Sequence, residues 1–164
     1  IDPKVENAGI GALLTANGLS LDDTTAYGLK VSAKPMDGLT LCAAYTDVDG
    51  NDADKVNVGI QNVGGVKTPL YTQMVANQGA ISLAADTLML KAAYSLGDMG
   101  TVIAQYGMTD SDVANNDFNE LDVIYKVKAG GVSYLAAYVN TDAETGAATS
   151  VDTDIVRVWA RYNF

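Results

Sequence analysis

The feature that most constrains the fold is an alternation, with a period of two, between apolar side chains and polar or small ones. In residues 90–110, LKAAYSLGDMGTVIAQYGMTD, apolar or aromatic side chains occupy every second position on both sides of a short turn that contains glycine. Side chains of a strand point alternately to its two faces, so this spacing predicts a β-hairpin with one apolar face. The alternation alone does not tell whether that face contacts a protein core or lipid.

The same alternation recurs along the chain and predicts an all-β protein. Eight strands are expected, at residues 6–16, 24–34, 38–47, 86–95, 99–109, 118–128, 131–140 and 152–164. Most of them exceed the usual length of about 5–6 residues and approach the roughly 9–11 that a tilted strand needs to cross a bilayer. No segment has a convincing helical period, and no apolar run approaches the roughly 18 residues of a membrane-spanning helix. The pattern therefore favours an antiparallel transmembrane β-barrel of at least eight strands, with residues 1–164 in one domain.

The connections between these strands are of two kinds. Short turns are expected at 34–38, 95–100 and 128–131, where Pro and Gly supply the dihedral angles of a tight reversal. The other connections are long, and they hold in or at their edges thirteen of the 20 acidic residues: Asp22, Asp23, Asp47, Asp49, Asp52, Asp54, Asp110, Asp112, Asp117, Asp142, Glu144, Asp152 and Asp154. Short turns at one rim and long polar loops at the other are typical of outer-membrane barrels.

The longest connection, residues 48–85, is expected to be an extracellular loop or a loop folded into the lumen. It contains a further alternating run, KVNVGI, and leaves room for two more strands. Within it, TPLYTQMV at 68–75 either lines a constriction or packs inside the loop.

Charge separates the two faces of the expected strands. The tyrosine-bearing parity is uncharged at positions such as Leu88, Leu90, Ala92 and Tyr94, whereas the opposite parity holds most of the basic residues. A charge on the lipid face of a barrel costs about 2–4 kcal/mol at the midplane, so this separation is what a barrel requires. A soluble β-sandwich is the alternative, but it leaves the strand length and the loop asymmetry unexplained.

The tyrosines of the apolar face fall at two heights. With strands that alternate in direction, Tyr45, Tyr106 and Tyr138 lie near the long-loop rim, and Tyr94, Tyr125 and Tyr162 lie near the short-turn rim. Amphipathic rings favour the two membrane–water interfaces, so these residues predict two aromatic belts.

The final strand, DTDIVRVWARYNF, gives the most specific pattern. Its even positions form an apolar face that ends on Tyr162 and Phe164, and this resembles the C-terminal assembly signal of outer-membrane barrels. Together with the hairpin DFNELDVIYKVKAGGVSYLAAYVN, it resembles the closing strands of Gram-negative porins, most of all the major outer-membrane porins of epsilonproteobacteria, best over about the last 80 residues. The resemblance implies a barrel of 16 or 18 strands, a homotrimer, contact with outer-membrane lipid and lipopolysaccharide, folding by the barrel-assembly machinery, extracellular loops and a periplasmic C-terminus.

The chain is about half as long as such porins. Either it is a complete eight-stranded barrel or it is the C-terminal portion of a larger one. An eight-stranded barrel has an interior that side chains just fill. The many small residues of the charged parity would fill it poorly, which favours the second interpretation.

The function expected from these features is passive diffusion of small hydrophilic solutes and ions, with no enzymatic activity and no cofactor. The predicted pore-lining residues are Lys30, Lys91, Glu120, Asp122, Lys126, Arg157 and Arg161. The alternative for these residues is that the basic ones only pair with the two acidic ones. A small non-conducting anchor or adhesion barrel is a second candidate function.

The composition argues against other classes of function. The chain has no His, which removes the usual general base of outer-membrane hydrolases. Its net charge of −10 argues against nucleic-acid binding, which needs clustered Lys and Arg. The acidic run at 47–54 offers Asp47, Asp49, Asp52 and Asp54 as hard oxygen ligands for Ca²⁺, although it lacks the spacing of an EF-hand and is also compatible with a solvated loop.

Overall fold

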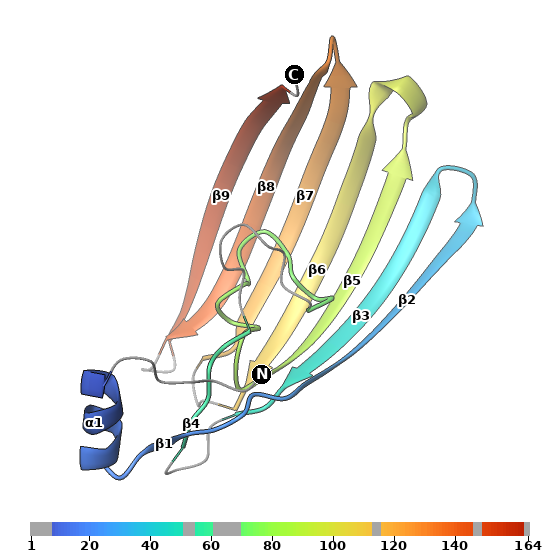
Figure 1. Ribbon diagram of the computed structural model, residues 1–164. Coiled ribbons are helices and arrows are strands. Elements are labelled where there is room, and N and C mark those ends of the chain that lie inside the picture. The colour runs from blue at the N-terminus through green and yellow to red at the C-terminus, as the bar shows by residue number, and fades with distance from the viewer. Residues whose placement is uncertain (1–7, 51–54, 61–69, 113–115, 146–148, 163–164) are drawn as a thin grey trace.

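The protein folds into one curved antiparallel sheet of seven strands (Figure 1). The computed structural model describes residues 8–50, 55–60, 70–112, 116–145 and 149–162. In the order of their pairing, the strands are β2 (Ala26–Met36), β3 (Leu39–Val48), β5 (Ala85–Ser95), β6 (Thr101–Ser111), β7 (Phe118–Ala129), β8 (Val132–Thr145) and β9 (Thr149–Tyr162). The strands of this sheet thus pair in the order in which they occur along the chain. In the described residues the sheet is open, with β2 and β9 at its two edges.

The predicted all-β class is confirmed, and seven of the eight expected strands are present within a few residues of their predicted bounds. The expected short turns join them at one end of the sheet. Between β7 and β8 the turn consists of Gly130 and Gly131, both with positive φ, which is the backbone of a type I′ hairpin. Between β5 and β6 the reversal contains a short 3₁₀ helix, Gly97–Met99.

The remaining prediction, a strand at residues 6–16, was wrong. Residues Ala8–Ala16 form the helix α1, whose sequence AGIGALLTA contains several of the strongest helix formers. The helix ends in a Schellman motif: the Leu19 N–H donates to Leu14 O, the Gly18 N–H donates to Thr15 O, and Gly18 has φ +69°. Apolar alternation in a run of Ala, Gly and Leu does not distinguish strand from helix, and no neighbouring strand pairs with this segment in the described structure.

The alternating run KVNVGI forms only the two-residue strand β4 (Lys55–Val56), which pairs in parallel with β1 (Ser20–Leu21). This small ladder continues as side-chain contacts, with Thr24 Oγ1 donating to Val58 O at 2.7 Å. The Lys55 ammonium donates to Asp22 Oδ2 at 2.9 Å. That hydrogen bond, with a second one from the Asp23 backbone, holds the pKa of Asp22 below its usual value.

The two faces of the sheet differ in what covers them. Residues 70–84, named here the inner segment, lie across one face, which we call the inner face (Figure 1). Inner-face residues of the long-loop half are buried beneath it, for example Ala44, Thr87 and Val139. The opposite, outer face carries the exposed apolar and aromatic side chains of the same strands. None of the helices in the described part of the chain has the length and hydrophobicity needed to span a bilayer.

Candidate functional site

The inner segment is fixed to the sheet by a carboxylate of β7. The backbone N–H groups of Val75 and Ala76 donate to Glu120 Oε1 at 2.9 and 2.8 Å. The Glu120 side chain is only 1% exposed. The two amides therefore exchange hydrogen bonds to water for hydrogen bonds to one carboxyl oxygen. Glu120 therefore acts as the acceptor that holds the middle of the segment against the strand.

Further polar contacts fix the two sides of this attachment point. Thr72 Oγ1 and Thr46 Oγ1 lie 2.6 Å apart, which joins the segment to β3, and Arg157 Nη1 donates to Val75 O at 3.4 Å from β9. Within the segment, Asn77 accepts from the Met74 N–H at 2.8 Å and donates to Thr72 O at 3.0 Å. The segment thus has its own internal bonds and is attached to three separate strands.

Apolar side chains of the inner segment fill the inner face between these polar contacts. Leu70 and Ile81 pack with Val48, and Met74 packs with Ala44 and Met89. Val75 and Ala76 lie against a cluster formed by Ile103, Ile124, Ala137 and Val139 from β6, β7 and β8. Burial of these side chains accounts for the close fit of a segment that has no regular secondary structure.

Gly107 permits the closest approach. A Cβ at this position would lie 2.6 Å from Met74 Sδ, a distance that real side chains do not adopt. Gly28 has a milder role, since a Cβ there would meet Thr46 and Tyr71 at 3.4 Å. The small residues of the inner face therefore make room for the inner segment.

We expect Gly107→Ala to destabilise the packed inner segment by about 1–3 kcal/mol, because the added methyl overlaps the Met74 sulfur. The double variant Gly107→Ala/Met74→Ala should recover part of that loss, and a double-mutant cycle measured by urea unfolding gives the coupling. Gly79→Ala is the matched control, since nothing lies within 4 Å of a Cβ at Gly79. Equal effects at both glycines would contradict the proposed contact with Met74.

Beside Glu120, a second carboxyl group is buried on the same face of β7. Asp122 is 0% exposed, and its Oδ2 accepts from Gln105 Nε2 at 2.6 Å. Glu120 Oε2 and Asp122 Oδ1 have no donor among the described residues, although the two carboxyl groups lie within hydrogen-bonding reach of one another. Ionised carboxylates only accept hydrogen bonds, so a single proton held between the two groups would satisfy both oxygens.

The structure places the residues predicted to line a pore in two different environments. All seven lie at inner-face positions of their strands. Glu120 and Asp122 are covered by the inner segment and contact protein, and Lys91 is partly buried. The exposed members are Lys30, Lys126, Arg157 and Arg161. Lys30 Nζ lies 6.0 Å from the centroid of the Tyr71 ring, and Arg157 contacts the inner segment, so both flank the covered region.

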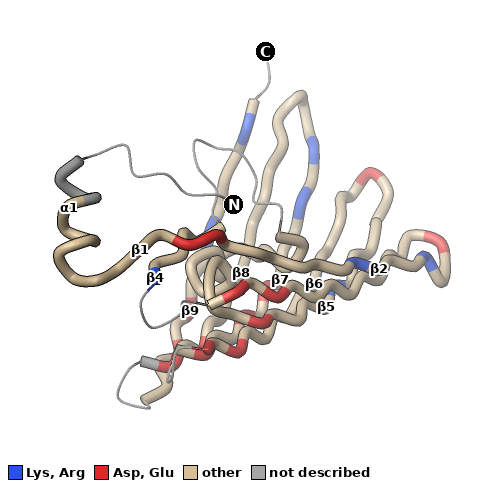
Figure 2. Tube along the Cα trace, turned by 60° about the horizontal axis from the view of Figure 1, so that its bottom comes forward, with Lys and Arg blue, Asp and Glu red and all other residues tan. Residues whose placement is uncertain are grey.

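Charge is also separated along the strands. Acidic residues gather toward the long-loop end of the sheet, whereas the basic residues of β7 and β9 lie toward the short-turn end (Figure 2). The inner segment covers the long-loop half of the inner face and leaves Lys126, Lys128 and Arg161 exposed in the other half. The inner face therefore has a covered half that is mostly neutral at its surface and an open half that is basic.

The six tyrosines of the predicted belts all lie exposed on the outer face: Tyr45, Tyr94, Tyr106, Tyr125, Tyr138 and Tyr162. Two of those near the long-loop end donate their hydroxyls to carboxylates, Tyr45 to Asp86 and Tyr138 to Asp154, both at 2.7 Å. At the short-turn end, the Tyr125 hydroxyl donates to Met99 O. Their role at a membrane interface stays a prediction. Phe164, the other residue of the expected assembly signal, lies outside the described residues.

The predicted calcium ligands are only partly described. Asp47 is the penultimate residue of β3, on the outer-face parity, and Asp49 follows in the loop, while Asp52 and Asp54 lie outside the described residues. Within the described ranges, no three His, Cys, Asp or Glu side chains are grouped so as to hold a metal ion. Calcium binding by this loop stays a prediction.

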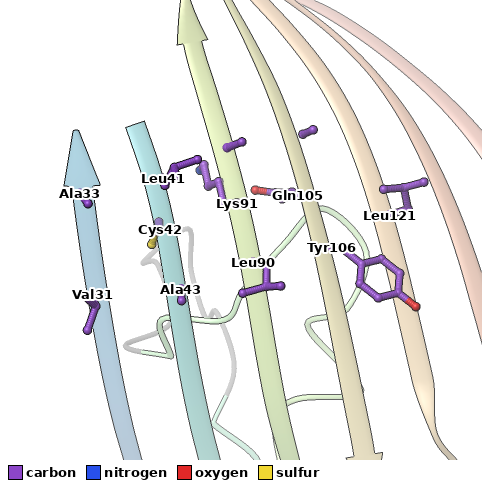
Figure 3. A pocket seen from close by; sticks show the side chains of 12 residues that line it. Val31, Ala33, Leu41, Cys42, Ala43, Leu90, Lys91, Gln105, Tyr106 and Leu121 are labelled. Carbon is purple, nitrogen blue, oxygen red and sulfur yellow. The ribbon is translucent and has the colours of Figure 1, made fainter. Parts of the chain in front are cut away.

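A hollow of about 540 Å³ lies on the apolar side of β2, β3, β5, β6 and β7 (Figure 3). Small side chains lower its surface at Ala33, Ala43, Ala92 and Ala104, and larger ones such as Leu90 and Tyr106 stand beside them. Cys42, Lys91 and Gln105, from the inner parity, also contribute to its lining. The rest of the lining is apolar or aromatic, which suggests contact with an apolar environment.

Sequence reasoning did not find the attachment of the inner segment. It named Glu120 and Asp122 only as wall charges, and it left the role of TPLYTQMV open between a constriction and internal packing. The described part of that run packs on the sheet and on its own loop residues. One feature of the sequence could have indicated this attachment. Two carboxyl groups occupy successive inner positions of β7, and the small residue Gly107 lies opposite Glu120 on the neighbouring strand.

Comparison with known proteins gives one match. A family model described as Gram-negative porin matches residues 5–126. This range covers most of the chain. It overlaps only part of the last 80 residues, where the resemblance in sequence is strongest, and it does not include the final strand. No curated protein and no solved structure matches the chain significantly.

Proposed function

Because the chain belongs to the Gram-negative porin family, whose members reside in the outer membrane, we propose that it forms a passive diffusion channel for small hydrophilic solutes and ions. In this proposal the sheet of β2 to β9 is part of a closed transmembrane barrel of 16 to 18 strands. The inner face borders the aqueous passage, and the inner segment narrows it.

The observation that carries the proposal is the opposite chemistry of the two faces of one sheet. Between the long-loop rim and the short turns, the outer face bears only uncharged, largely apolar side chains that are exposed, such as Leu90, Val123 and Val158. Exposed apolar surface of this extent marks contact with a membrane or another protein. The basic side chains of the same strands, by contrast, are on the inner face, where water and solutes would meet them.

The finer assignments belong to the same proposal. The long loops would be extracellular and the C-terminus periplasmic, with outer-membrane lipid and lipopolysaccharide around the barrel. Folding by the barrel-assembly machinery, assembly as a homotrimer and a specific relationship to the major porins of epsilonproteobacteria are inferred from the resemblance in sequence.

Reconstitution of the full chain into planar lipid bilayers tests the proposed function. We expect discrete, ohmic conductance steps and, in liposome swelling, entry of small sugars that falls with solute size. Folded protein that inserts into bilayers but never conducts would reject the diffusion channel and favour the non-conducting anchor or adhesion barrel.

Arg157 gives a more specific prediction about the passage. Its guanidinium is exposed on the inner face at the edge of the inner segment, where a fixed charge acts on passing ions over less than the screening length of about 10 Å in 0.1 M salt. Arg157→Glu should increase cation selectivity, measured as a shift of the reversal potential across a salt gradient. Arg157→Lys keeps the charge and should retain the wild-type value. An unchanged potential for Arg157→Glu at low ionic strength would place Arg157 outside the conducting path.

A further inference from the structure

The open half of the inner face contains a second hollow, separate from the region that the inner segment covers. It has a volume of about 950 Å³ and lies at the short-turn end of β6, β7, β8 and β9. The main side chains of its lining are Lys126, Lys128, Ser133, Leu135, Trp159 and Arg161. Thr101 borders it on β6, and Asp98 contributes the one carboxylate, from the turn that precedes β6.

Strand register brings the basic groups of this hollow into rows. Lys128, Ser133 and Arg161 are register partners across β7, β8 and β9. The next inner row along the same strands holds Lys126, Leu135 and Trp159. Neighbouring strands lie about 4.8 Å apart, so the Cα atoms of Lys128 and Arg161 are separated by about 10 Å. Side chains of this length can therefore reach one small anion placed over Ser133.

The three cations have no carboxylate partner in the described structure, where Lys55 and Asp22 form the single ion pair. Lys126, Lys128 and Arg161 are all exposed. Three positive charges on β7 and β9, the two neighbours of β8, repel one another, and an anion placed among them relieves this repulsion.

The second row adds an apolar surface beside the charges. Trp159 is 41% exposed, and Leu135, its register partner on the adjacent strand, is partly buried. A flat indole ring next to an ammonium and an isobutyl group suits the hydrocarbon or aromatic part of a ligand better than it suits a bare inorganic ion.

From these observations we propose that the hollow at the short-turn end is a binding site for a small organic anion. The anionic group, a carboxylate or phosphate, lies among Lys126, Lys128 and Arg161 and accepts from the Ser133 hydroxyl. The apolar group of the ligand lies on Trp159 and Leu135. Binding at this site is an equilibrium property of the inner face and does not depend on whether the protein conducts ions.

The chain offers a direct probe, because Trp159 is its only tryptophan. The full chain, folded in detergent micelles, is titrated with cyclohexanecarboxylate, which joins a carboxylate to an apolar ring and does not absorb where tryptophan is excited. Acetate supplies the charge alone, and cyclohexanemethanol supplies the ring alone and reports partition into micelles. We expect a saturable change in Trp159 fluorescence with cyclohexanecarboxylate, an affinity roughly tenfold weaker for acetate, and no saturable change with the alcohol.

Substitutions then distinguish a specific binding site from a general effect of positive charge on the inner face. Lys128→Gln and Arg161→Gln should each weaken the binding of cyclohexanecarboxylate by about tenfold, and Lys128→Arg should restore it. Lys34→Gln is the matched control: it removes one positive charge from the short-turn end of the inner face but lies on β2, four strands from β7.

Two results would overturn the proposal. One is the absence of a saturable signal with cyclohexanecarboxylate in wild-type protein that is folded, as judged by its β-sheet circular dichroism. The other is a loss of affinity in Lys34→Gln equal to that in Lys128→Gln. Conductance is not read in this experiment, so its failure would leave the diffusion channel untouched, and a failure of the channel would leave the binding site untouched.

Discussion

Glu120→Ala is expected to release the middle of the inner segment from the sheet and to raise single-channel conductance. The Val75 and Ala76 amides lose their shared acceptor, and leaving such buried donors unpaired costs about 1–3 kcal/mol each. The segment avoids part of this cost by opening to water. A net loss of about 2 kcal/mol in local stability corresponds to roughly thirtyfold faster hydrogen exchange at those two amides.

Two variants make the Glu120 prediction selective. Glu120→Gln keeps an oxygen that accepts from both amides and places an amide donor toward Asp122, so it should stay close to wild type. Glu144→Ala removes an exposed carboxylate at the long-loop end and should leave both exchange and conductance unchanged. If Glu120→Ala leaves amide exchange unaltered, the attachment does not hold the segment. If exchange rises while conductance does not, the segment is not the constriction.

Leu90→Lys is expected to have the other large effect, on stability in the membrane. Leu90 is exposed in the middle of the outer face, and its register partners Ala43 and Tyr106 carry no charge. If this face contacts hydrocarbon, the ammonium costs about 2–4 kcal/mol near the bilayer midplane. Urea titration of folding into lipid vesicles measures the loss.

Ser32→Lys is the matched control for Leu90→Lys. Ser32 is exposed at an inner-face position of β2, so a charge there meets water and should change stability by no more than about 0.5 kcal/mol. Equal costs for the two lysines would mean that the two faces have the same environment. If Leu90→Lys does not lower stability, the outer face does not contact lipid, and the proposed membrane channel loses its main support.

The absence of charge from the middle of the outer face agrees with contact between this face and hydrocarbon, and it was predictable from the sequence. Asp47, Asp86 and Asp110 occupy the outer parity only at the long-loop end, where they share one register row, and Leu88 and Leu90 follow without a charge. Because the period of a strand is two, the face on which each side chain lies follows from its position in the chain. The parity of the charged and apolar residues was therefore predictable without any knowledge of tertiary contacts.

The same local rule explains why one predicted strand is a helix and why another alternating run forms only a short strand. Residues 8–16 alternate weakly, but no strand pairs with them in the described structure, and their Ala and Leu content favours a helix closed by Gly18. In KVNVGI the alternation is clearer, yet only Lys55 and Val56 find a partner, in β1. A strand exists only where a neighbour supplies hydrogen bonds, and alternation does not report the neighbour.

By itself the sequence determined the class of the fold, the positions of seven strands, their short turns and the assignment of each side chain to one of two faces. These properties depend on local spacing and on turn residues such as Gly130 and Gly131. The tertiary structure alone decided where the inner segment lies. The Val75 and Ala76 amides find their acceptor at Glu120, more than forty positions along the chain, and the Met74 sulfur occupies space that a Cβ at Gly107 would take. Likewise, Lys128 and Arg161 share a row only through the register of β7, β8 and β9. Contacts of this kind arise from the pairing of distant segments, and the period of a single strand carries no information about them.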